Sequence, residues 1–281
     1  MNNPKYSVVV VHGISDKIGD QQPGFSEALG AKVMPDQSVR DKYWVEAVWE
    51  SVNNALDDKI QDIVLKLVDS YDKTTYWRDS ELAKATSGMC KACIWIRWCL
   101  FKSFRAWLVK KTVRALDLVL DLPMYLGDPK GERIRTKVKD AIRKALAANA
   151  NGVILVGHSL GAVIAYDVIR ESQSEGGEHF PIKAFVTMGS PLDWVTDLRI
   201  VDKELSGTVF DIGGIDWVNF YDEQDPVPLN RDLPKSRFPD VHNEPAICSG
   251  EKYIDAHTVY WQRDEVVRMV RSLCYDGCKP S

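Results

Sequence analysis

The segment VILVGHSLGAVIAYD, residues 153–167, constrains the fold of this chain more than any other stretch. It begins as an apolar run rich in β-branched residues, which is typical of a strand buried on both faces, and it continues with helical spacing. Between the two, Gly157–Gly161 has the pattern Gly-x-Ser-x-Gly. Glycines are needed two positions before and after such a serine, because strand and helix crowd together at the sharp turn. The segment therefore predicts a strand, a tight turn and a helix, with the Ser159 hydroxyl projecting beyond the strand.

The rest of the chain alternates between strand and helix patterns. Apolar strand patterns occur at residues 7–13, 43–50, 183–191 and 216–228. Helical patterns occur at residues 132–150 and 263–274. In the first of these, an apolar residue recurs at every fourth position, at Ile134, Val138, Ile142 and Leu146. This alternation predicts an α/β fold of one domain, residues 1–281, in which helices cover both faces of a mostly parallel sheet.

The composition favours some classes of function over others. The 281 residues carry a formal net charge of −4, which does not favour a nucleic acid partner. The N-terminus lacks a charged segment followed by an apolar one, so we expect no signal peptide. Cys90 and Cys93, with Cys274 and Cys278, could be halves of a zinc site, but no histidine lies nearby. We therefore expect reduced thiols, no metal, no cofactor and a cytoplasmic location.

A serine hydroxyl is a weak nucleophile without a base, and the chain offers two main candidates. His257 lies just before the last predicted helix. It fits the order serine, acid, histidine that proteins with such a turn use, with the histidine on a loop after the last strand. His242, which has prolines nearby and no following helix, is the alternative. We predict His257 as the general base for Ser159.

The acid that orients the histidine should follow a strand as well. The predicted strand at residues 216–228 ends with Asp222, Glu223 and Asp225. Of these, Asp225 is favoured because the Asp-Pro-Val-Pro turn would hold it stiffly beyond the strand end. Asp193, which follows the preceding strand, is the alternative.

An oxyanion that forms on the substrate needs hydrogen-bond donors. The backbone N–H of Leu160 lies at the start of the predicted helix and is the first candidate. A second donor should follow an early strand, where His12, Gly13 and Ile14 stand. Gly13 would let the backbone approach closely, so we predict the N–H of Ile14 as the second donor.

Residues 51–126 interrupt the alternation and predict a helical insertion. Six of the nine tryptophans lie between Trp44 and Trp107, and residues 82–116 contain basic but no acidic residues. Charges at Arg97 and Lys102 break the long apolar runs, so no membrane-spanning helix is expected there. Three readings remain open: a peripheral contact with anionic lipid, a cap that selects apolar substrates, or a helical layer packed on the sheet.

These motifs together resemble the α/β-hydrolase superfamily. VVVVHGI, VILVGHSLGAVIAYD, VTMGSPL, NFYDEQDPVP and AHTVYW are similar to segments of lipase-like serine hydrolases related to the GPI-inositol deacylases. The similarity covers residues 7–14 and 132–261. It implies Ser159 as nucleophile, Asp225 as acid and His257 as base, with Ile14 and Leu160 as the oxyanion donors.

The expected function is the hydrolysis of a carboxylic ester, and a lipid or acyl ester would suit the apolar insertion. The same groups would also serve an acyltransferase, a thioesterase or an amidase. A binding protein that has kept the hydrolase fold is the remaining possibility. A degraded triad or a missing glycine in the turn would favour it, and neither is seen in the sequence.

Overall fold

The computed structural model describes residues 3–13, 25–48, 125, 130–193, 195–196, 211–225, 227–228, 232–245, 247–251 and 254–277. The chain divides into two compact units, residues 1–49 with 135–281, and residues 50–134. Of the second unit only Tyr125 and residues 130–134 are described. The expected insertion at residues 51–126 lies outside the described residues except for Tyr125. The insertion and the single domain therefore stay predictions.

The described part of the chain contains one sheet of six strands. They are β1 (Ser7–Val11), β2 (Trp44–Ala47), β3 (Val153–His158), β4 (Ile182–Met188), β5 (Asp216–Phe220) and β6 (Val241–Asn243). Their order across the sheet is β2-β1-β3-β4-β5-β6, and every neighbouring pair is parallel. Parallel pairing places the carboxyl ends of all six strands along one edge, which is where loops can carry a site.

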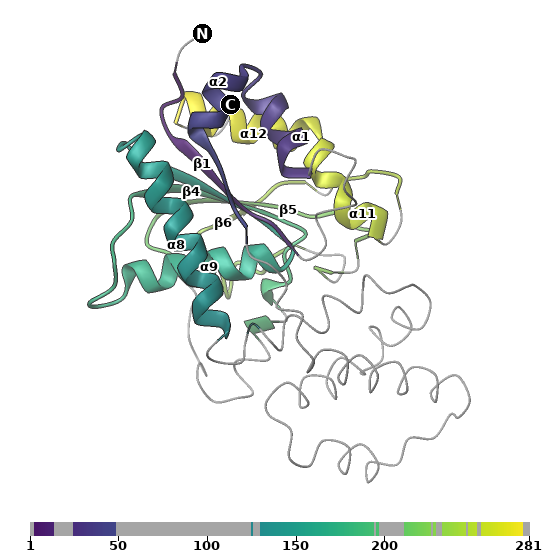
Figure 1. Cartoon of the computed structure of the whole chain (residues 1–281). Helices are drawn as coiled ribbons and strands as arrows, with labels where there is room; N and C mark the ends of the chain where they lie inside the picture. The colour runs from purple at the N-terminus through teal and green to yellow at the C-terminus, as the bar shows by residue number, and fades with distance from the viewer. Residues whose placement is uncertain are drawn as a thin grey trace, which may run out of the picture. The chain divides into compact units, whose positions relative to one another are not determined.

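Helices cover both faces of this sheet, as Figure 1 shows. One face carries α8 (Lys130–Ala148) and α9 (Leu160–Gln173). The other carries α1 (Phe25–Val33), α2 (Gln37–Tyr43) and α12 (Asp264–Tyr275). The short helix α11 (Ile254–Thr258) and the 3₁₀-helix η1 (Val259–Gln262) lead into α12. The predicted α/β fold with a largely parallel sheet is confirmed.

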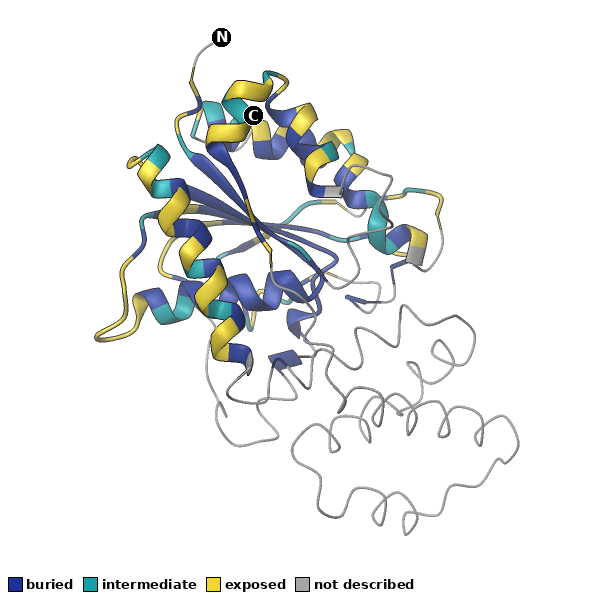
Figure 2. Cartoon of the chain, in the orientation of Figure 1, coloured by how far each residue is buried: buried dark blue, intermediate teal, exposed yellow. Residues whose placement is uncertain are grey.

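The core lies on both sides of the strands because their side chains alternate between the faces. Val8 and Ile154 belong to the cluster that packs with Leu29 of α1 and Leu273 of α12. On the other face, Tyr166 of α9 forms part of an aromatic group with Phe185, Trp217 and Phe238. All residues of β1 and β3 are buried. Most exposed positions of the described residues fall on the outer faces of the helices and in the loops (Figure 2).

The element boundaries differ from the predicted ones in several places. The predicted strand at 216–228 stops at Phe220, and Tyr43 ends α2 rather than beginning β2. Helix α8 ends at Ala148, short of the predicted end at 150. The sequence analysis missed α1, α2, α11 and β6. The last two have only five and three residues, too few to show a hydrophobic period.

Candidate active site

Ser159 occupies the junction between β3 and α9 in a strained backbone conformation. Its φ is 54° and its ψ is −129°, and it is the one non-glycine residue with positive φ in the described part of the chain. Such a conformation is costly for a residue with a Cβ atom and persists only where the surrounding structure enforces it. Here the Ser159 N–H donates to the carbonyl oxygen of Met188 at 3.0 Å, which ties the turn to β4. The serine itself is 4% exposed.

The glycines of the pentapeptide make this turn sterically possible. A Cβ atom on Gly157 would lie 2.6 Å from the Cα atom of Ala162, within the first turn of α9. A Cβ atom on Gly161 would collide with the carbonyl oxygen of Val11 and lie 2.6 Å from that of His12. These neighbours are backbone atoms and cannot swing away. The α9 helix can therefore start this close to β3 and β1 only with glycine at both positions.

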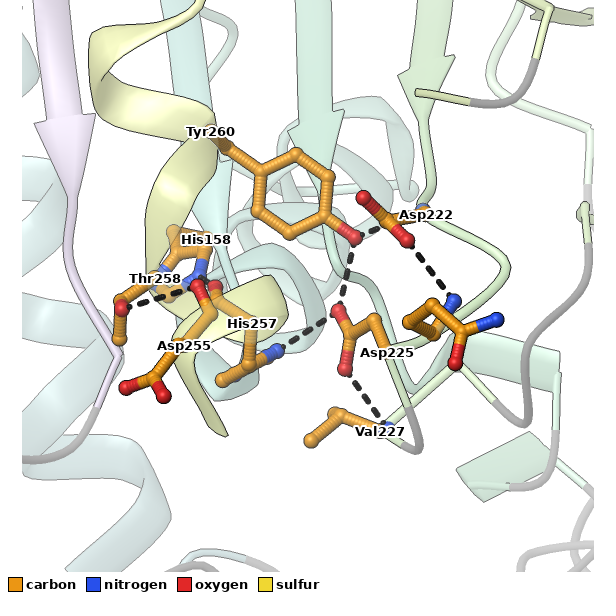
Figure 3. Close-up of polar contacts among 9 residues, drawn as sticks. His158, Asp222, Asp225, Val227, Asp255, His257, Thr258 and Tyr260 are labelled. Atoms are coloured by element: carbon orange, nitrogen blue, oxygen red, sulfur yellow. Dashed lines mark hydrogen bonds and ion pairs between the residues drawn. The ribbon is translucent and has the colours of Figure 1, made fainter. Parts of the chain in front are cut away.

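Asp225 and His257 form a hydrogen-bonded pair at the same edge of the sheet (Figure 3). The distance from His257 Nδ1 to Asp225 Oδ2 is 2.9 Å. Asp225 lies in the turn after β5 and is fully buried, whereas His257 lies in α11. The other carboxylate oxygen, Oδ1, accepts the N–H of Val227 at 2.9 Å. The Tyr260 hydroxyl adds a third donor, 2.7 Å from Oδ2. These bonds compensate the cost of burying the carboxylate.

His158, the residue before the serine, links the turn to the helix that carries His257. Its Nε2 atom lies 2.7 Å from the His257 carbonyl oxygen, and the two ring centroids are 4.6 Å apart. Because a carbonyl oxygen only accepts, the proton must be on His158 Nε2. The sequence analysis gave this buried histidine no role. Its contact is with the main chain of a residue far along the sequence, which no local pattern signals.

Two further glycines bring the strand ends together. A Cβ atom on Gly13, after β1, would lie 2.7 Å from the Ser159 Cβ atom. A Cβ atom on Gly189, after β4, would lie 2.8 Å from Asp225 Oδ2 and 2.9 Å from His257 Nδ1. The serine and the Asp225–His257 pair are thus gathered by segments that follow β1, β3, β4 and β5.

A comparison with known protein families agrees with this geometry. Residues 128–276 match the family described as lecithin:cholesterol acyltransferase, and they make up just over half of the chain. The chain belongs to the lecithin:cholesterol acyltransferase family. The members of this α/β-hydrolase-like lipase family act on lipids as esterases and acyltransferases. None of the curated protein sequences matches the chain. The narrower resemblance to GPI-inositol deacylases is not part of the family match and stays a prediction.

In this member of the lecithin:cholesterol acyltransferase family, the other candidate acids do not bond to His257 in the described contacts. Asp193 accepts Arg237 Nη1 at 2.8 Å, and the same nitrogen also reaches the Asp193 carbonyl oxygen. The Asp222 carboxylate accepts the backbone N–H groups of Gln224 at 2.8 Å and Ser249 at 3.1 Å. Glu223 is exposed. Among these four acids, the structure brings Asp225 to His257.

The next residues to place are the alternative base, His242, and the two predicted oxyanion donors, Leu160 and Ile14. His242 lies in β6, half exposed, with its Nε2 atom 3.4 Å from Glu244 Oε1. Leu160 is the first residue of α9, where backbone N–H groups have no partner within the helix. Ile14 lies outside the described residues. His257 itself lies in a short helix rather than in the predicted loop.

The described residues form neither a metal site nor a membrane-spanning helix. No group of three or more His, Cys, Asp or Glu side chains is arranged there to hold a metal ion. Cys274 is buried and donates to the carbonyl oxygen of Tyr6, whereas Cys248 is exposed. The remaining cysteines of the zinc hypothesis, Cys90, Cys93 and Cys278, lie outside the described residues. Among the described helices, none is both long and apolar enough to cross a bilayer.

Proposed function

We propose that this chain cleaves a carboxylic ester of a lipid through a triad of Ser159, His257 and Asp225. The observation that carries the proposal is the 2.9 Å bond between His257 Nδ1 and Asp225 Oδ2, at the sheet edge where Ser159 is held with positive φ. A buried acid bonded to a histidine, beside a strained serine between strand and helix, is the arrangement that acyl transfer requires. Membership of a family of lipid-acting enzymes supports a lipid ester as the substrate.

The hydrogen bond to Asp225 also sets the protonation of His257 that the reaction needs. A neutral imidazole that donates from Nδ1 leaves Nε2 unprotonated and able to accept a proton. In the proposed mechanism, Nε2 takes the proton of the Ser159 hydroxyl as Oγ attacks the ester carbonyl carbon. The N–H groups of Leu160 and Ile14 stabilise the oxyanion. The alcohol leaves with the proton from His257, and an acyl-enzyme remains.

The fate of the acyl-enzyme gives a second candidate function. Water would release a fatty acid, whereas an alcohol would yield a new ester without any change in the protein groups involved. The family includes acyltransferases, which favours testing this second outcome beside hydrolysis. A thioester or an amide substrate would use the same steps. Measuring the products from a labelled ester, with and without a competing alcohol, separates hydrolysis from transfer.

The location of the enzyme and its approach to lipid belong to the same proposal. We propose a cytoplasmic enzyme that contacts membranes peripherally through the basic, Trp-rich residues 88–116, without nucleic acid, metal or cofactor. Electrostatic attachment of this kind weakens as salt rises. Sedimentation with anionic vesicles at low and high salt tests it. Equal binding at both salt concentrations, or no binding, contradicts the membrane contact.

The nucleophile is tested with a fluorophosphonate probe, which labels activated serines covalently. We expect the wild-type protein to be labelled and Ser159→Ala to remain unlabelled. Ser172→Ala is the matched control, because Ser172 is also a buried serine of the same α9 region and accepts only the N–H of Phe180 in the described contacts. Its labelling should equal that of the wild type. Equal labelling of wild type and Ser159→Ala would exclude the proposed nucleophile.

The substrate class is tested next with esters of increasing acyl length and with phospholipids, using Ser159→Ala as the blank. Hydrolysis that grows with acyl length supports a lipid substrate. Turnover restricted to short, water-soluble esters contradicts it.

A further inference from the structure

The hydroxyl group of Tyr260 lies between two acidic residues at the edge of the proposed triad. It is 2.7 Å from Asp225 Oδ2 and 2.9 Å from the backbone nitrogen of Asp222 (Figure 3). The Asp222 N–H can only donate, so the tyrosine oxygen accepts this bond. The single hydroxyl proton is therefore directed at Asp225. Tyr260 is fully buried in η1, which leaves the ring no alternative position in solvent.

This proton reaches the same carboxylate oxygen that receives the N–H of His257. Asp225 Oδ2 accepts both, at 2.7 Å from Tyr260 and 2.9 Å from His257, while Oδ1 accepts only the N–H of Val227 among the described contacts. Hydrogen bonds to an ionised carboxylate are strong, because each donor is attracted to its negative charge. The tyrosine thus competes with the histidine for the charge on one oxygen atom.

We propose that Tyr260 is a positioning residue that holds Asp225 against His257 and limits how basic His257 becomes. The inference rests on the proposed triad and adds a residue to it that does not touch the substrate. Without the hydroxyl, more of the carboxylate charge would act on the imidazolium form of His257 and stabilise it. The histidine would then stay protonated, and inactive as a base, up to a higher pH.

The ionisation of Tyr260 itself does not interfere with this role. Burial, followed by the nearby charge of Asp225, raises its pKa well above the usual range for tyrosine, so it remains a donor at every pH suited to an assay. Among the described residues, the other ionisable groups that face His257 are Asp225, from the turn after β5, and His158, from the turn after β3. Asp255, in the same helix as His257, is exposed.

Two changes of Tyr260 should shift the acid limb of the pH profile in opposite directions. Tyr260→Phe removes the hydroxyl, and we expect the acid limb of the pH profile to rise by roughly half a pH unit or more. Replacing Tyr260 alone by 3-fluorotyrosine keeps the bond and makes the hydroxyl a stronger donor, so the limb should fall. Tyr275→Phe is the matched control, because Tyr275 also packs against the core and makes no described contact with the site.

The readout is the second-order rate of fluorophosphonate labelling against pH, which requires no knowledge of the substrate. An NMR titration of the His257 ring, assigned by the signal missing from His257→Gln, measures the same ionisation without any activity. Opposite shifts for the two variants, with none in Tyr275→Phe, are the expected result. If both variants are labelled more slowly but neither the pH profile of labelling nor the NMR titration of His257 shifts, the proposed role of Tyr260 is wrong. Failure of the triad is recognised separately, by labelling of Ser159→Ala.

Discussion

The Nε2 atom of His158 donates a hydrogen bond of 2.7 Å to the main-chain carbonyl oxygen of His257. The residue next to the proposed nucleophile thereby restrains the helix that carries the proposed base. His158 is 1% exposed, and its ring also packs edge-on against Trp261 of η1. The relative position of Ser159 and His257 therefore depends on a contact within the protein core.

Replacing His158 by phenylalanine keeps a planar ring and removes the donor. We expect kcat to fall by about tenfold or more with a smaller change in KM, because the base is less well placed for proton transfer. Steady-state kinetics on an ester substrate measure both constants. His179→Phe is the control, since His179 is exposed, and it should behave as wild type. Wild-type kcat in His158→Phe would show that this bond does not position His257.

Asp225, the acid favoured from the sequence, and Asp193, its alternative, follow the neighbouring strands β5 and β4, and their asparagine variants should differ. Asp225→Asn keeps the shape but removes the charge that stabilises the imidazolium, so kcat should fall by about 10⁴-fold. Asp193→Asn weakens a contact with Arg237, so we expect a lower Tm and a nearly unchanged kcat. Parallel kinetics and thermal unfolding check both. A large loss of kcat in Asp193→Asn alone would reverse the assignment of the acid.

Gly189 has φ of 54° and lies against the Asp225–His257 pair. In Gly189→Ala the added methyl group falls within 3 Å of both polar atoms of that pair, so the hydrogen bond must open. We expect kcat/KM to fall by about 100-fold. Gly176→Ala is the control because Gly176 also has positive φ, 76°, but has open space around it. It carries the same backbone strain and should keep full activity; equal losses in both variants would point to strain alone.

The buried thiol of Cys274 makes stability depend on pH in the alkaline range. Burial raises its pKa from the usual value near 9 to about 12. The folded chain therefore keeps a proton that the unfolded chain releases above pH 9, so the free energy of unfolding decreases as the pH rises from 9 towards 12. At pH 10 this amounts to about 1 kcal/mol relative to pH 8. Cys274→Val should lose this part of the decrease.

Urea unfolding at pH 8 and pH 10 measures the effect. Buried Tyr260 contributes less to the decrease in this pH range, because a tyrosine in the unfolded chain has a pKa near 10 and loses its proton only at the upper end of the range. Cys248→Val is the control, because Cys248 is exposed and should leave the decrease unchanged. An equal decrease in wild type and Cys274→Val would rule out the buried thiol as its source.

The sequence predicted the fold and the strained turn because the information for both is local. A buried parallel strand, two glycines around a serine and a helical period fit within residues 153–167, and the same alternation recurs along the chain. In the Gly-x-Ser-x-Gly turn, backbone atoms of Ala162 lie close to Gly157 and those of Val11 lie close to Gly161. Glycine is the residue that permits this approach. Asp225 and His257 could be proposed from their order in the chain, the Asp-Pro-Val-Pro turn and the helix that follows His257.

The tertiary structure decided which groups meet. His158 and His257 are 99 positions apart in the sequence, and Tyr260 joins Asp222 and Asp225 from a helix that follows a different strand. No local periodicity encodes such contacts, because they arise from the parallel packing that gathers the strand ends at one edge of the sheet. The sequence by itself determined the turn that strains Ser159 and pointed to Asp225; only the packed sheet brings Asp225, Tyr260 and His158 together around His257.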